Sequence, residues 1–180
     1  SRVRRQRQMC IRDRNDTDIE ICYLSASDTL KKYKEKKLSP VEVLSAVIKR
    51  IETVNPKINA FNYLDFDKSL ELAKESEKKF SNNNDVLPLE GIPLAIKDEV
   101  NIKGQPNRNG CLLLKNNIAQ KTDIDVETIV NSGAILHGRT TNPEFSLTSF
   151  CHSKLNGVTR NPWNLDCLLY TSPSPRDTRR

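Results

Sequence analysis

The sequence of 180 residues has no long apolar run and only two histidines, and these absences exclude several classes of protein. No stretch approaches the roughly 20 apolar residues that a membrane-spanning helix needs. The Arg-rich start is not followed by the apolar core of a signal peptide. His137 and His152 have no partner at metal-ligand spacing, which argues against a zinc site. We therefore predict neither a membrane span nor a bound metal.

The cysteines form no closely spaced pair and are odd in number, which argues against a disulfide framework. They are Cys10, Cys22, Cys111, Cys151 and Cys167. Isolated reduced thiols are typical of proteins from a reducing compartment. We therefore expect a cytoplasmic protein.

The net charge of +6 belongs to the two ends of the chain. Residues 1–14 hold six Arg and one Asp, and residues 166–180 hold three Arg and two Asp, which leaves 20 basic and 20 acidic residues between them. Nucleic-acid-binding proteins need a basic face, and the body of this chain has no excess positive charge. We therefore expect no nucleic-acid partner.

The ends also differ from the middle in the kind of cation they use. They carry nine Arg and no Lys, whereas the middle carries 16 Lys and four Arg. The stretches MCIRDR and CLLYTSPSPRD resemble translated sequencing-adaptor sequence. We therefore expect residues 1–14 and 166–180 to be non-native, the latter as a disordered tail, and residues 15–165 to be the domain. A natural basic arm and tail is the alternative.

Helical and strand patterns alternate along the middle of the chain. The capping patterns Ser25-Ala-Ser-Asp28 and Ser39-Pro-Val-Glu42 predict one helix over 25–36 and a second that starts at 39 and stops at Asn55-Pro56. Further helices are predicted over 66–80, 123–131 and 143–148, and strands over 59–64, 92–96 and 134–137. This alternation predicts an α/β layer architecture.

The stretch GIPLAIKDEV, residues 91–100, places a lysine at the end of an apolar strand. Because burial of an unpaired ammonium is strongly unfavourable, Lys97 is either the first exposed residue after the strand or a residue with a special role. In the first case it pairs locally with Asp98 or Glu99. In the second, burial favours the neutral amine, which can take the proton of a serine hydroxyl as a catalytic base. The stretch alone leaves both interpretations open.

Three blocks in order resemble the N-terminal third of the amidase signature family. They are PLEGIPLAIKD (88–98), SGAILHGRTTNPEF (132–145) and NGVTRNPWNL (156–165), and the resemblance covers about residues 24–165. It implies the N-terminal part of a mixed-sheet α/β/α sandwich. It also implies a serine hydrolase that cleaves carbon–nitrogen bonds of small-molecule amides without a cofactor. In its Ser–Ser–Lys arrangement, Lys97 stands at the position of the general base.

The same resemblance places the bridging serine and the nucleophilic serine after Leu165, where this sequence continues as DCLLYTSPSPRD. Ser172 and Ser174 lie in a proline-rich stretch without glycine, so they are not assigned these roles. We therefore expect a truncated amidase that is inactive as written, because the nucleophile and the oxyanion hole are both missing.

Two alternatives stay open. One is the A-type subunit of a glutaminyl-tRNA amidotransferase, which releases ammonia from glutamine. The stretch Thr141-Asn-Pro-Glu-Phe145 fits a stand-alone amidase better than that subunit. The other is a non-catalytic α/β interaction module. A homodimer of the complete enzyme also stays open.

Overall fold

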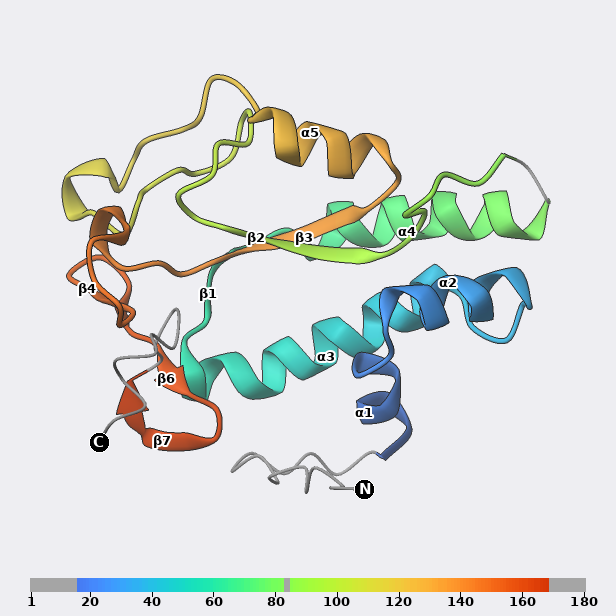
Figure 1. Cartoon of the computed structure of the whole chain (residues 1–180), viewed down its shortest axis with the longest axis horizontal. Helices are drawn as coiled ribbons and strands as arrows, with labels where there is room; N and C mark the ends of the chain where they lie inside the picture. The colour runs from blue at the N-terminus through green and yellow to red at the C-terminus, as the bar shows by residue number, and fades with distance from the viewer. Residues whose placement is uncertain (1–15, 83–84, 169–180) are drawn as a thin grey trace, which may run out of the picture.

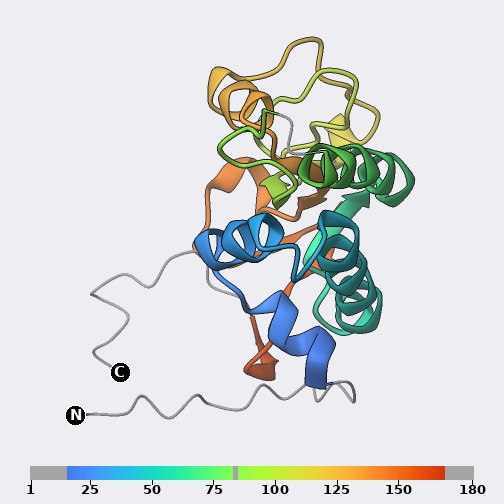
Figure 2. The ribbon, with the colours of Figure 1, turned by 90° about the vertical axis from the view of Figure 1, so that its right-hand side faces the viewer.

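Three strands in the order β1-β3-β2 form the sheet that positions the rest of the chain. β1 (Phe61–Leu64) runs antiparallel to β3 (Ile135–Thr140), and β2 (Pro93–Lys97) runs parallel to it, so the sheet is mixed as predicted. Helix α3 (Pro40–Ile58) lies on one side of these strands and α5 (Ile124–Asn131) on the other (Figure 1, Figure 2). This computed structural model describes residues 16–82 and 85–168, so most of the two ends predicted to be non-native lies outside the described residues.

The first helices begin where the sequence predicts them. The Ser25 hydroxyl accepts the Asp28 amide at 3.1 Å and caps α2 (Ala26–Lys34). At the start of α3, Ser39 and Glu42 form both halves of a capping box, with bonds of 3.2 and 2.8 Å. A short helix before them, α1 (Asp16–Cys22), was not predicted. Local capping chemistry therefore fixes the two predicted starts.

The predicted end of the second helix is wrong. Helix α3 does not stop at Asn55-Pro56 but continues to Ile58 and ends at Asn59, whose φ of 53° is left-handed. The side chain of Asn55 accepts the amides of Ala60 and Phe61 at 2.8 and 2.9 Å, so the chain leaves the helix after the proline rather than at it.

The helix predicted over 143–148 is also wrong, because only the short 3₁₀ helix η2 (Glu144–Ser146) forms there. Phe145 and Ser146 have left-handed φ values of 48° and 55°. The amide of Phe145 donates to the carbonyl of Asn109 at 2.9 Å, which ties this turn to a distant loop.

Apolar helix faces hold the layers together. Tyr33, Val43 and Phe80 join α2, α3 and α4 (Phe66–Ser81), and the rings of Tyr33 and Phe80 meet edge-on at 5.2 Å. Leu44 and Ile135 join α3 to the central strand in a second cluster. Burial of each large apolar side chain stabilises the fold by about 2 kcal/mol.

The remaining elements are short. They are η1 (Leu112–Leu114), the pair β4 (His152–Ser153) and β5 (Gly157–Val158), and the pair β6 (Arg160–Asn161) and β7 (Asn164–Leu168). Residues 166–168 of the expected tail thus lie in β7. Within the described ranges, no helix combines the length and the apolar character needed to cross a bilayer.

Candidate active site

Lys97 is the last residue of β2, and its side chain is 35% exposed. Its Nζ donates to the hydroxyl of Ser146 at 3.0 Å and lies 2.9 Å from a carboxylate oxygen of Glu99. Of the two local pairings that the sequence suggests, the one with Glu99 therefore forms, and the lysine amine is not buried as the catalytic-base interpretation expects. Sequence reasoning missed Ser146, because only the fold brings η2 to the end of β2.

The three side chains close a hydrogen-bonded triangle, because the Ser146 hydroxyl also donates to Glu99. The hydrogen bond from Ser146 and the interaction with Lys97 lower the pKa of Glu99 from its ordinary value, although partial burial acts in the opposite direction. Glu99 is thus a carboxylate at neutral pH, fixed beside the lysine nitrogen.

Asp98, the residue after β2, has other partners than Lys97. Its side chain is buried and accepts the backbone amides of Arg108 at 3.4 Å and Gly110 at 3.5 Å. Asp98 therefore holds the far end of the loop that follows β2 and is not an acid–base partner of Lys97.

Arg139, on β3, is a second residue that sequence reasoning missed. Its side chain is fully buried, and its Nη2 donates to the carbonyls of Lys97 at 3.1 Å, Asp98 at 3.3 Å and Val100. Burial lowers the pKa of Arg139, while the charges of Asp98 and Asp123 raise it. The signal in the sequence was an arginine inside a buried strand, a position where a charged side chain needs partners.

The loop after β2 is held by polar side chains. Asp123, at the start of α5, accepts the backbone amide of Asn101 at 2.8 Å. The Asn107 side chain donates to that of Asn101 at 2.8 Å, and Asn117 donates to the carbonyl of Asn107 at 2.7 Å. This network fixes the loop that follows Lys97 to the start of α5.

His137 is a core residue rather than part of the site. It is 4% exposed in β3, its ring lies 5.9 Å from that of Phe61, and its Nδ1 has no hydrogen-bond partner among the described residues. Burial lowers the pKa of His137 to about 4, so the ring is neutral at physiological pH.

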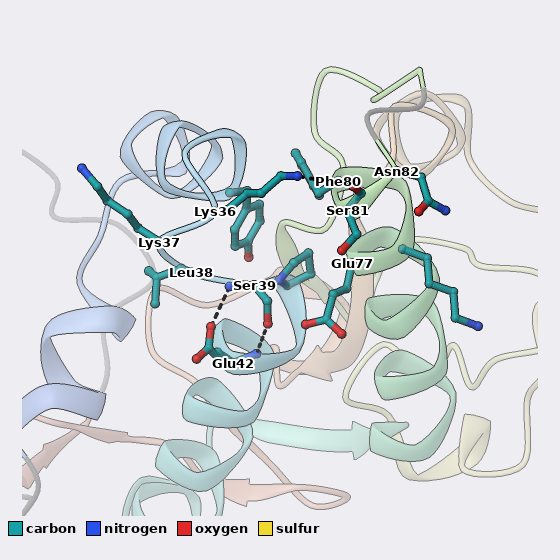
Figure 3. Close-up of a pocket in the computed structure, with 12 residues that line it drawn as sticks. Lys36, Lys37, Leu38, Ser39, Glu42, Glu77, Phe80, Ser81 and Asn82 are labelled. Atoms are coloured by element: carbon teal, nitrogen blue, oxygen red, sulfur yellow. Dashed lines mark hydrogen bonds between the residues drawn. The ribbon is translucent and has the colours of Figure 1, made fainter.

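A pocket of about 400 Å³ lies where the end of α2, the start of α3 and the end of α4 meet (Figure 3). Lys36 reaches across it to the carbonyl of Ser81 at 3.4 Å. The capping box of Ser39 and Glu42 occupies the start of α3 at its wall. The lining side chains carry charges of both signs, and those of Lys36 and Glu42 already bond to backbone groups, so we take Lys97 rather than this pocket as the candidate site.

Comparisons with known proteins agree on one family. The sequence profile of the Amidase family matches residues 42–169. The A-type subunit of the glutamyl-tRNA(Gln) amidotransferase of Methylacidiphilum infernorum is 36% identical over 143 residues, which is 79% of this chain and 28% of that protein. The indoleacetamide hydrolase of Bradyrhizobium diazoefficiens is also 36% identical over 143 residues, 79% of this chain and 27% of that protein.

The fold gives the same result. A solved structure of a fatty acid amide hydrolase superposes with a TM-score of 0.78 and 28% identity, and the match covers 84% of this chain and 27% of that one. The chain thus spans less than a third of the length of the proteins it matches. With a family profile over most of its residues and the matching fold, this chain belongs to the amidase signature family.

Proposed function

We propose that residues 24–165 are the N-terminal part of an amidase that hydrolyses the carbon–nitrogen bond of a small-molecule amide, with Lys97 as general base. The observation that carries the proposal is the place of Lys97. It ends a strand in the matched segment, its side chain is partly open to solvent, and its Nζ already hydrogen-bonds a hydroxyl at 3.0 Å.

The chemistry needs a neutral amine beside a serine. The lysine nitrogen takes the proton of the bridging serine, which takes the proton of the nucleophilic serine as the oxygen of the latter attacks the amide carbon. The resulting ammonium then gives that proton to the nitrogen of the leaving group, and water hydrolyses the acyl-enzyme. We assign both serines to the part of the complete protein that corresponds to the remaining length of the relatives, so the 180-residue chain alone is expected to be inactive.

A second function has the same support from the relatives. The indoleacetamide hydrolase and the amidotransferase subunit share the same 36% identity with this chain. Both activities would begin with attack on a carboxamide, and they would differ in what happens to the ammonia. Similarity in this segment therefore does not separate them.

A graft tests the proposal. Residues 24–165 replace the matched segment of the Bradyrhizobium hydrolase, and the unmodified host is the control. We expect the graft to hydrolyse indoleacetamide. A graft that folds, as judged by its melting curve, but does not cleave the amide would contradict the proposal. Release of ammonia from glutamine by the graft, without cleavage of indoleacetamide, would favour the amidotransferase function.

A further inference from the structure

The turn that carries Ser146 is in an unfavourable backbone conformation. Phe145 and Ser146 are consecutive, both have a left-handed φ, and neither is glycine. Side chains with a Cβ atom are disfavoured in this region, and such residues cluster at functional sites.

Backbone hydrogen bonds hold the turn in place. The Phe145 amide donates to Asn109 at 2.9 Å, and the Ser146 amide donates to Pro143 at 2.9 Å. Gly110 packs against the same turn so closely that a Cβ there would lie 2.7 Å from the carbonyl of Asn142. The result of this arrangement is that one hydroxyl faces Lys97 Nζ.

We propose that Ser146 and Glu99 are positioning residues that aim the lone pair of the Lys97 amine. This inference rests on the proposed role of Lys97 as base. A neutral amine has two N–H donors and one lone pair. The two neighbours of Nζ, at 3.0 and 2.9 Å, match those two donors. The lone pair is then left to point away from both, toward an incoming hydroxyl.

The same arrangement serves the proton transfer. When the amine takes the proton of the bridging serine, that O–H bond breaks, a third N–H bond forms and the nitrogen becomes positive, while the bridging oxygen takes the proton of the nucleophilic hydroxyl. The Glu99 carboxylate lies 2.9 Å from that nitrogen. Ser146 joins the two groups by accepting from Lys97 and donating to Glu99. Glu99 thus orients the base, as the aspartate does in a Ser-His-Asp triad.

The first test follows the carboxyl carbon of Glu99 by NMR as a function of pH in the full 180-residue chain. Ser146→Ala and Lys97→Met should each shift the pKa of Glu99 upward, because each removes a group that lowers it. Ser146→Gly should do the same while relieving the backbone strain, so it reports on the hydroxyl even where the alanine variant folds poorly. Thr148→Ala, whose hydroxyl bonds to Phe150 at 2.9 Å, is the matched control and should leave the titration unchanged. If the pKa of Glu99 is the same in both Ser146 variants as in the parent chain, the proposal is overturned.

The second test measures kinetics in the active graft. Ser146→Ala and Glu99→Gln should lower kcat by up to about a hundredfold with KM unchanged, because a misaimed base affects the chemical step and not substrate binding. An unchanged kcat in both variants would overturn the positioning role. If the parent graft is inactive but the pKa of Glu99 still shifts in the Ser146 variants, the result counts against the amidase function and not against the contact of Ser146 with Glu99. The two failures are therefore distinguishable.

Discussion

The Nη2 of Arg139, on the central strand, donates to the carbonyl of Lys97 at 3.1 Å, on the neighbouring strand. The same nitrogen also contacts the carbonyls of Asp98 and Val100. A fully buried guanidinium therefore holds the start of the chain that follows Lys97. The position of Lys97 at the end of β2 is therefore fixed by side-chain hydrogen bonds as well as by strand pairing.

Replacement of this arginine should loosen the end of β2. Arg139→Met leaves the carbonyls of Asp98 and Val100 without this charged donor, whereas that of Lys97 still accepts the Val100 amide, and each buried unpaired acceptor costs about 1–3 kcal/mol. We expect a loss of about 3 kcal/mol or more in the free energy of unfolding, measured with urea, and faster amide hydrogen exchange over residues 98–110. Arg160→Met is the control, because that exposed side chain donates to Leu165 at 2.8 Å and should cost far less. Equal losses in both variants would argue against the role of Arg139.

His137 should make stability depend on pH. Its pKa falls from 6.5 to about 4 on folding, so between these values the unfolded chain binds a proton that the folded chain does not. The contribution of His137 to the free energy of unfolding is therefore complete above about pH 6.5 and decreases as the pH falls toward 4, by on the order of 3 kcal/mol. His137→Leu should reduce the dependence of the free energy of unfolding on pH in this range, as measured with urea, whereas His152→Gln should not. The same slope in the leucine variant would show that other groups cause it.

Substitutions at two glycines should distinguish the cost of backbone strain from the cost of steric crowding. Gly104 and Gly133 both have positive φ, of 80° and 97°. A Cβ at Gly133 would lie 2.8 Å from the Cα of Glu90, whereas one at Gly104 would meet no described atom within 4 Å. Gly104→Ala should therefore cost only the left-handed penalty of about 1–2 kcal/mol, and Gly133→Ala clearly more. Thermal unfolding of both variants checks the order, and equal costs would contradict it.

The apolar surface beside the site should bind a hydrophobic dye. Leu113 and Leu147, in η1 and just after η2, are 92% and 80% exposed, and β1 and β2 are the two edges of the sheet. If the chain is part of a larger amidase domain, we expect ANS binding and a broad thermal transition at neutral pH. A sharp transition without ANS binding would instead favour the non-catalytic interaction module.

The sequence was most informative where structure depends on near neighbours. The caps at Ser25 and Ser39 act over three residues, so the starts of α2 and α3 were predictable. Lys97 at the end of an apolar strand was predictable for the same reason. The contacts of Arg139 and Ser146 with Lys97 cross 42 and 49 residues, and no local pattern encodes them.

The strained turn explains the failed helix prediction over 143–148. The polar residues and the proline there satisfy the local pattern of a helix start. The bond from Phe145 to Asn109 overrides that pattern, because it exists only once two distant loops meet. Tertiary contacts thus decide the conformation of the segment that completes the candidate site.

The most direct measurement of the central assignment is kcat for amide hydrolysis by the graft with Lys97→Ala, beside Lys103→Ala as control. If Lys97 is the general base, its alanine variant should lose on the order of a thousandfold in kcat while its melting temperature stays that of the parent. The Lys103 variant should retain full activity. A Lys97→Ala graft that keeps kcat within about tenfold of the parent would contradict the assignment, since a general base contributes roughly a hundredfold or more.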